Sequence, residues 1–249
     1  MERAPEMNPL LSTVGLLFDG REEADRRFLG SCFCVTAAGV FVTAAHCLDH
    51  VPLDRLWINH FGGPEPHAFT PAKSIDLIRE ADTAVVVTDA PNAKWVRPFG
   101  RVRFFANLGE PVCALGYPFG SVQVDVPPRE TFRFFRGHIQ RPFVHRSPRS
   151  GGARYSAYEL SFPCPFGLSG GPVFLAEDPT TVIGVVTEDL EVGTTLREDV
   201  EEAGGRVREV RRVVNYGVAA NIIAAADMLE RILGGPLPVV GVTVHTDTS

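Results

Sequence analysis

The chain has 249 residues, of which 45% are hydrophobic and 22% are charged, with a net charge of −6. This length is sufficient for one large core or two smaller ones. No apolar run approaches the roughly 20 residues that a membrane-spanning helix needs. The acidic balance gives no general attraction to nucleic acid or anionic lipid. We therefore expect a soluble protein with neither nucleic acid nor a membrane as partner.

Short β-type runs follow one another along the chain and are separated by turns rich in Gly and Pro. Such a pattern is typical of an all-β barrel or sandwich. The N-terminal apolar stretch is broken by polar residues and is interpreted as the first strand, not as a secretory signal. The expected strands are residues 14–18, 33–36, 40–43, 56–59, 84–87, 112–115, 131–135, 155–161, 173–175 and 182–187.

The last predicted element is a helix over residues 222–233, where apolar residues recur at helical spacing and Gly234-Gly235-Pro236 follows. Before it, residues 194–213 are rich in charge and contain Gly204-Gly205. This segment favours a long exposed hairpin over a helix, which would have to contain both glycines. Pairing about that turn would place Glu201 opposite Arg208 and Glu198 opposite Arg211.

Five cysteines stand at positions 32, 34, 47, 113 and 164, an odd number without the compact spacing of a disulfide framework. Free thiols and a reducing compartment suit this pattern. We therefore expect a cytoplasmic protein.

The most informative motif is Gly167-Leu168-Ser169-Gly170-Gly171-Pro172. Glycines let such a turn direct several backbone N–H groups at one point. Acyl transfer needs this geometry, because negative charge develops on the carbonyl oxygen when a nucleophile attacks. The motif predicts Ser169 as nucleophile, with the N–H groups of Gly167 and Ser169 as an oxyanion hole.

A base and an orienting acid precede this serine in the chain. His46 ends the apolar run Phe41-Val42-Thr43-Ala44-Ala45, and histidine is the usual base for a hydroxyl nucleophile. The other six histidines lie in polar or Pro-rich surroundings and are expected at the surface. Asp82 directly precedes a strand and is preferred as the acid over Asp76 and Asp89. The order His, Asp, Ser is that of chymotrypsin-type enzymes.

Together these residues resemble the chymotrypsin-like serine proteases, most closely the bacterial trypsin-like and Deg/HtrA-type branch without a PDZ domain. Gly30-Ser31-Cys32-Phe33 looks like the opening strand of that branch, and Gly116-Tyr117-Pro118-Phe119-Gly120 like its Gly-x-Pro-Phe-Gly loop. The resemblance implies two six-stranded antiparallel β-barrels with a C-terminal α-helix. We expect one peptidase domain, residues 1–249, with barrels over 10–95 and 105–220 and the helix over 221–234.

The resemblance also implies a serine endopeptidase that cleaves protein or peptide substrates and needs no cofactor and no metal. It assigns substrate binding to Val186, Thr187, Glu188, Asp189 and Gly217. The carboxylates at 188 and 189 would form an acidic rim that favours a basic or small residue before the cleaved bond; the alternative is that both point into solvent.

Departures from the family pattern leave alternatives open. Leu168 replaces the aspartate that receives a freed N-terminus in digestive proteases, so no N-terminal cleavage is expected to activate the chain. A disulfide from Cys32 or Cys34 to Cys47 is an alternative to free thiols. Residues 129–154, in which arginines alternate with phenylalanines, favour alternating strands with Phe inward and Arg outward, followed by a loop over 146–154. A nucleic-acid surface and an acidic protein partner are the alternatives, and control by a regulatory partner through this loop is plausible. The alternative function is a latent or inactive protease-fold protein that binds a peptide or partner.

Overall fold

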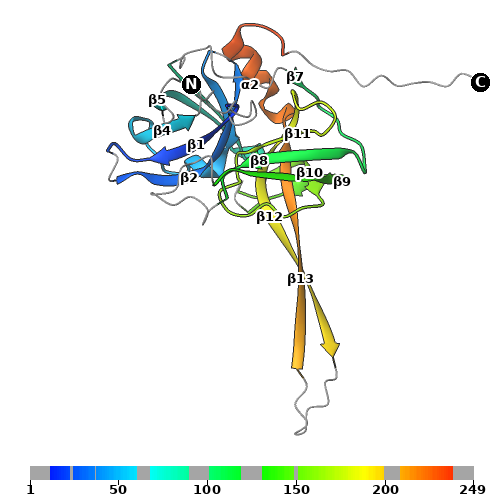
Figure 1. The fold of residues 1–249 in the computed structure, drawn as a ribbon. Coiled ribbons are helices and arrows are strands. Elements are labelled where there is room, and N and C mark those ends of the chain that lie inside the picture. Colours follow the sequence, from blue (N-terminus) through cyan, green and yellow to red (C-terminus); the bar gives the residue numbers. More distant parts are fainter. Residues whose placement is uncertain are drawn as a thin grey trace, which may run out of the picture.

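The computed structural model describes residues 12–22, 25–36, 38–60, 68–89, 101–118, 131–148, 151–198 and 208–237. Six strands close into an antiparallel barrel in the order β1-β2-β3-β6-β5-β4 (Figure 1). These strands are β1 Val14–Asp19, β2 Arg27–Thr36, β3 Val40–Ala44, β4 Leu56–His60, β5 Ala68–Ile78 and β6 Thr83–Thr88. Short 3₁₀ turns, η2 Ala45–Leu48, η3 Leu53–Arg55 and η4 Arg79–Ala81, follow β3 and precede β4 and β6.

The second half of the chain forms a ring of six antiparallel strands, β11-β8-β9-β10-β13-β12, which closes through β11 and β12. The short β7 runs parallel to β12 at its start. The predicted fold of two six-stranded barrels is therefore confirmed. The bounds are β7 Arg101–Val102, β8 Pro111–Gly116, β9 Arg133–Arg146, β10 Arg154–Leu160, β11 Pro172–Leu175, β12 Thr181–Glu198 and β13 Arg208–Asn221.

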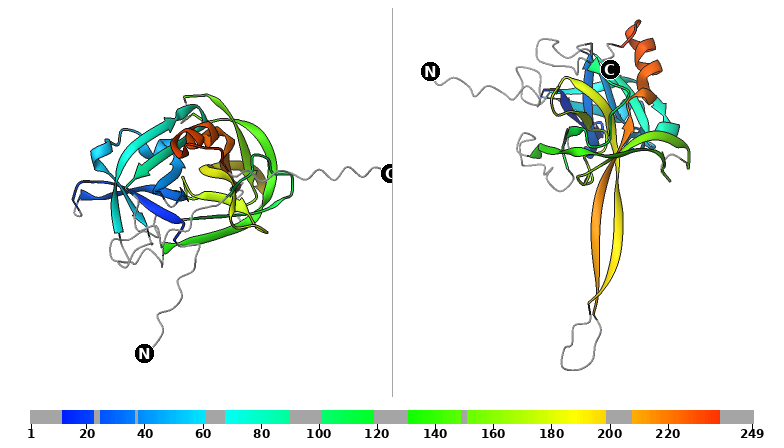
Figure 2. Two further views of the ribbon diagram at one scale, coloured as in Figure 1. Left: turned by 90° about the horizontal axis from the view of Figure 1, so that it is seen from above. Right: turned by 90° about the vertical axis from the view of Figure 1, so that its right-hand side faces the viewer.

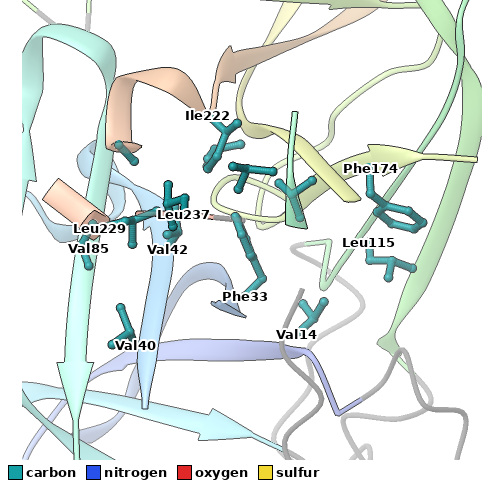
Figure 3. Close-up of a cluster of buried hydrophobic side chains, with 14 of the residues drawn as sticks. Val14, Phe33, Val40, Val42, Val85, Leu115, Phe174, Ile222, Leu229 and Leu237 are labelled. Carbon is teal, nitrogen blue, oxygen red and sulfur yellow. The ribbon is translucent and has the colours of Figure 1, made fainter. Parts of the chain in front are cut away.

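The largest hydrophobic cluster lies between the two barrels and under α2, Ile223–Leu233. Figure 3 shows Phe33, Val42 and Val85 of the first barrel in the same cluster as Leu115 and Phe174 of the second. Leu229 of α2 is fully buried in it. Gly234 ends the helix in the left-handed conformation, with φ 68°. Because both barrels and α2 contribute side chains to this one core, the core fixes the position of the two barrels relative to each other.

α2 matches the predicted helix, and no helix among the described residues is long and apolar enough to cross a membrane.

β5 and β9 are two of the strands that differ from the predicted ranges. β5 was not predicted, because residues 68–78 mix Pro71, Lys73 and Asp76 with apolar residues and only partly bury them. β9 is one continuous strand over Arg133–Arg146, where the prediction had a strand over 131–135 within a region of alternating strands. In both strands one face is exposed, so the apolar signal is weak although the backbone pairs on both sides.

The predicted hairpin exists, but its predicted register is wrong. β12 and β13 form a ribbon that projects from the barrels on the side away from α2 (Figure 2). Glu198 lies opposite Arg208, and Thr195 lies opposite Arg211. Glu201 and Gly204-Gly205 lie outside the described residues. Inside the barrel, a bulge at Thr187 shifts the pairing of the two strands by one residue.

Candidate active site

The partly buried His46 and the buried Asp82 form a pair at one end of the first barrel. His46 lies in η2, directly after β3, and Asp82 lies between η4 and β6. Nδ1 of His46 lies 2.8 Å from Oδ2 of Asp82, and the backbone N–H of His46 donates to Oδ1 at 2.9 Å. Asp82 adopts a left-handed conformation with φ 47°, which is uncommon outside glycine. The carboxylate thus holds both the ring and the backbone of His46.

The surroundings of His46 raise its pKa above the ordinary histidine value. Burial alone lowers the pKa, because it disfavours the charged ring. The hydrogen bonds with Asp82 and Cys47 and the negative charge of Asp82 act in the opposite direction and outweigh burial. The Asp82 side chain is only 2% exposed, so its charge is poorly screened. An imidazolium formed at this position is therefore stabilised.

Ser169 lies in a buried turn between β10 and β11 of the second barrel. Gly167 and Gly170, on either side of it, have φ of 90° and 85°, which L side chains rarely adopt. A Cβ on Gly170 would come within 2.0 Å of the Ser31 carbonyl oxygen and 2.2 Å of Thr43 Oγ1. The close fit against β2 and β3 therefore requires glycine at position 170.

The N–H groups of Gly167 and Ser169 donate to no acceptor among the described residues, although both residues are buried. Neighbouring donors in the same turn are engaged: Gly170 N–H donates to Val186 O at 2.8 Å, and Gly171 N–H donates to Leu168 O at 2.8 Å. Buried N–H groups are almost always paired. Within the part of the chain that the structure describes, these two N–H groups are therefore available to a further acceptor.

Ser31 in β2 is a positioning residue whose role was not predicted, and it connects the two barrels at this turn. Its hydroxyl donates to Gly167 O at 2.7 Å and accepts from Tyr117 N–H at 3.0 Å. Its backbone N–H donates to Ser169 O at 2.9 Å. In the sequence, Gly30-Ser31 resembles the opening strand of the Deg/HtrA-type branch, but this resemblance does not indicate what the hydroxyl binds. Ser31 anchors the carbonyl sides of both residues that present the free donors.

The turn of Ser169 also lies against the chain segment that carries His46. Cys47 Sγ lies 3.8 Å from Ser169 O. A Cβ on Gly30 would lie 2.8 Å from Cys47 Sγ and 2.9 Å from Ser169 O. The Ser169 hydroxyl itself donates to Thr187 O at 3.4 Å. The fold therefore brings the segments of His46, Asp82 and Ser169 to one place between the barrels.

The predicted substrate-binding residues lie on β12 and β13 beside Ser169. Val186 is hydrogen-bonded to the Ser169 turn, since its N–H donates to Gly171 O at 2.9 Å. Thr187 is fully buried, and its hydroxyl donates to Val218 O at 3.3 Å. Gly217 donates its N–H to Phe162 O at 2.8 Å, and a Cβ there would lie 2.2 Å from Cys164 Sγ. Gly217 is thus packed against the segment that leads to Ser169.

Both carboxylates of the predicted acidic rim have protein partners. Glu188 pairs with His145, and the two side chains are 12% and 10% exposed. Asp189 accepts from Cys164 N–H at 3.0 Å and from Asn215 Nδ2 at 2.7 Å. Neither points freely into solvent, which was the alternative. His145 is buried, as is His60, so the prediction that all other histidines lie at the surface is wrong for these two.

All five cysteines are free and buried. Burial raises the pKa of the Cys32 and Cys164 thiols well above the ordinary value, because the thiolate would be desolvated. Among the described residues, no group of three or more His, Cys, Asp or Glu side chains is placed to hold a metal ion.

A sequence model described as "Trypsin-like peptidase domain" matches residues 30–185, more than half of the chain, and spans His46, Asp82 and Ser169. The chain therefore belongs to the trypsin-like peptidase family. A comparison with curated protein sequences gave no significant match.

Solved structures share the fold at low identity. The MamO protease domain from Magnetospirillum magneticum has a TM-score of 0.61 and 13% identity over 89% of this chain and 97% of its own. The Rv3671c protease from M. tuberculosis, in its active form, has a TM-score of 0.59 and 18% identity over 97% of this chain and 95% of its own. The HtrA-type protease AlgW with a tripeptide has a TM-score of 0.57 and 17% identity over 90% of this chain and 60% of its own.

Proposed function

We propose that this protein is a serine endopeptidase in which His46, Asp82 and Ser169 form the catalytic triad. The observation that carries the proposal is a partly buried His46 held by the buried Asp82, together with a serine turn that offers two N–H donors without an acceptor among the described residues. A structural role requires neither feature. Serine, histidine and aspartate in these roles carry out acyl transfer on many unrelated folds.

In the proposed reaction, Ser169 Oγ attacks the carbonyl carbon of the scissile peptide bond while Nε2 of His46 takes its proton. For this step the hydroxyl turns from Thr187 O, its present acceptor, towards the imidazole. Asp82 stabilises the imidazolium that forms. The carbonyl oxygen, now negative, accepts from the N–H groups of Gly167 and Ser169.

The tetrahedral species then collapses, the C–N bond breaks, and His46 gives its proton to the leaving amine nitrogen. A water molecule attacks the resulting ester of Ser169 by the same route. His46 takes the proton of this water and returns it to Ser169 Oγ, which releases the acid product. No metal or organic cofactor enters these steps.

We propose peptides as substrates because the serine, its base and the two N–H donors suit attack on a peptide carbonyl. One structural neighbour, AlgW, was solved with a tripeptide. The outer edge of β12 from Glu188 onward has no partner strand among the described residues, so an extended peptide can add to it. The carboxylates of Glu188 and Asp189 already pair with protein groups, which argues against a simple acidic pocket for the substrate. The residue preferred before the cleaved bond is therefore best found with an unbiased peptide library.

The alternative is a latent or inactive protein of this fold that binds a peptide or partner. One observation favours it: Ser169 Oγ donates to Thr187 O in this structure. A regulatory protein partner could then be needed to free the hydroxyl. The five buried free thiols support a reducing, cytoplasmic location, which stays a prediction.

A fluorophosphonate probe, followed by mass spectrometric mapping of the adduct, tests the main proposal. We expect labelling of Ser169 that is lost in Ser169→Ala and strongly reduced in His46→Ala. Absence of labelling in the folded wild-type protein, together with no cleavage of a peptide library, would reject catalysis in favour of the alternative.

A further inference from the structure

Phe166 is a large aromatic side chain that lies uncovered three residues before the candidate nucleophile, Ser169. Its exposed fraction is 74%, the highest of any large hydrophobic residue among the described ones. Its aromatic neighbours in the same part of the chain, Phe162 and Phe174, are buried. Single exposed apolar side chains are common on protein surfaces, so exposure alone does not define a site. Phe166 differs from a scattered surface residue in the turn that carries it.

This turn fixes the backbone of Phe166. Leu168 N–H donates to Pro165 O at 3.0 Å, which closes a β-turn with Phe166 and Gly167 at its two central positions. Gly167 has a φ of 90°, and a positive φ at this position is typical of a type II turn. The second central residue, Gly167, is also the first of the two candidate oxyanion donors. The turn therefore places the phenyl ring directly beside the N–H groups that lack an acceptor among the described residues.

Hydrogen bonds to both barrels hold the turn at its two ends. Before it, Cys164 N–H donates to the Asp189 carboxylate on β12 at 3.0 Å. After it, Gly167 O accepts from the Ser31 hydroxyl on β2 at 2.7 Å. The ring of Phe166 is thus exposed on a backbone that is already ordered. A contact with such a side chain costs little conformational entropy.

The ring lies within reach of a substrate bound at Ser169. In the proposed reaction, the carbonyl oxygen of the cleaved bond accepts from Gly167 N–H, and this nitrogen is bonded to the carbonyl carbon of Phe166. A hydrogen bond of about 2.9 Å and standard bond lengths then place the Cα atoms of Phe166 and of the substrate residue at most about 8.5 Å apart. Side chains are in contact when their heavy atoms approach within about 4.5 Å. A large side chain next to the cleaved bond can therefore contact the phenyl ring.

The chemistry of this surface favours an apolar partner. The nearby carboxylates of Glu188 and Asp189 already have protein partners. A phenyl ring gains free energy when an apolar side chain removes it from water. A cation over the ring is its other favourable partner, but at exposed sites this contact is weaker than burial of the ring. The side chain that Phe166 selects is therefore aliphatic or aromatic.

We propose that Phe166 is a specificity-determining residue that contacts an apolar side chain of the substrate next to the cleaved bond. This inference rests on the proposed function and names one feature of its substrate. The ring touches a side chain and not the reacting atoms, so the contact is the same before and during the reaction. It therefore acts on KM more than on kcat. We expect an effect of about tenfold in kcat/KM, the lower end for one apolar contact, because the ring stays partly in water.

A positional peptide library measures this preference with the full chain. In a peptide that the wild-type chain cleaves, each residue near the cleaved bond, on its acyl side and on its amine side, is varied in turn among leucine, phenylalanine, serine, lysine and glutamate. At one position next to the bond, we expect leucine or phenylalanine to give about tenfold higher kcat/KM than serine. The preference should vanish in Phe166→Ala, persist in Phe166→Leu and change to lysine in Phe166→Glu.

Phe105→Ala is the matched control. Phe105 is 68% exposed and precedes β8, whereas the far end of β8 lies near the site: a Cβ on Gly116 would be 2.7 Å from Leu168 Cδ1. The control should keep the wild-type preference, and both alanine variants should unfold at the same urea concentration as the wild type. An equal loss of preference in both variants would overturn the proposal. So would a wild-type chain without an apolar preference, or one that prefers lysine at the position that Phe166→Ala affects.

Labelling and binding separate this proposal from the proposed function. Fluorophosphonate labelling of Ser169, with a preference that Phe166→Ala leaves intact, would support the protease and reject the contact. If the wild-type chain cleaves nothing, fluorescence anisotropy measures the contact in Ser169→Ala, with labelled hexapeptides in which leucine replaces serine at one position at a time. Tighter binding of one leucine peptide that is lost in Ser169→Ala/Phe166→Ala would support the contact without catalysis, and equal binding of all peptides would reject it.

Sedimentation velocity tests whether a second copy of the chain covers the ring instead. A dimer that Phe166→Ala dissociates, with no change in peptide preference, would reject the proposal. A wild-type monomer whose preference depends on Phe166 would support it.

Discussion

The Ser31→Ala variant tests whether the first barrel holds the oxyanion turn in place. The Ser31 hydroxyl is fully buried and satisfies two backbone groups, Gly167 O and Tyr117 N–H. A buried polar group left without a partner costs about 1–3 kcal/mol. With two such groups, we expect the free energy of unfolding to fall by roughly 2–4 kcal/mol, which a domain of about 5–15 kcal/mol survives.

The larger expected effect is on the reaction. Gly167 provides one of the two free N–H donors, and loss of one oxyanion donor typically costs about 3–4 kcal/mol of transition-state stabilisation. If the Gly167 peptide moves when its carbonyl loses the Ser31 hydroxyl, kcat should fall about 10²–10³-fold with little change in KM. The loss would be in kcat because the oxyanion exists only in the transition state.

Urea unfolding and steady-state cleavage of a library-selected peptide measure the two effects. Thr88→Val is the matched control, because the buried Thr88 hydroxyl donates to Gly39 O at the other end of β6, away from the site. The control should lose about 1 kcal/mol of stability and no activity. If Ser31→Ala loses stability but retains kcat within about twofold, the hydroxyl does not position the turn and this reasoning is wrong.

Three further predictions follow from the site. Because the pKa of His46 is raised above 6.5, kcat/KM should rise as the pH passes through this raised pKa. The stability that the His46–Asp82 ion pair contributes is full below pH 6.5 and should be lost as the pH rises through the raised pKa. Asp82→Asn should return the pKa of His46 towards its ordinary value. Gly170→Ala should prevent native folding, seen by circular dichroism, because its Cβ would overlap Ser31 O; Gly235→Ala, with no atom within 4 Å, should be neutral. The five cysteines should react with a thiol reagent only after unfolding, because all are buried; rapid reaction of the folded protein would contradict this.

The sequence was sufficient to predict the fold class and to nominate the residues of the candidate site. Strongly apolar strands such as β3 and β6 were found because both faces are buried, and α2 was found from its period and its terminal glycine. Ser169 was nominated because glycines lie on both sides of it in the sequence, and the structure shows that Gly167 and Gly170 have positive φ. β5 was missed because a strand with one exposed face carries a weaker apolar signal.

The roles of Ser31 and His145 could not be predicted from local sequence. Each is a single polar residue in a strand, and its partner lies far along the chain: Gly167 for Ser31 and Glu188 for His145. The hydrogen bond of Ser31 depends on how the two barrels pack, and the His145–Glu188 pair depends on how β9 and β12 close the second barrel. No local pattern encodes either arrangement.

The residue types and their order along the chain determined the chemistry available to this protein, since a nucleophile, a base, an acid and a glycine turn can be recognised locally. Only the tertiary structure decided how they meet and how β12 and β13 are paired. The bulge at Thr187, inside the second barrel, shifts that pairing by one residue, and such a shift exchanges the faces of a strand relative to its partner. It depends on the packing of the barrel, which no local sequence pattern encodes.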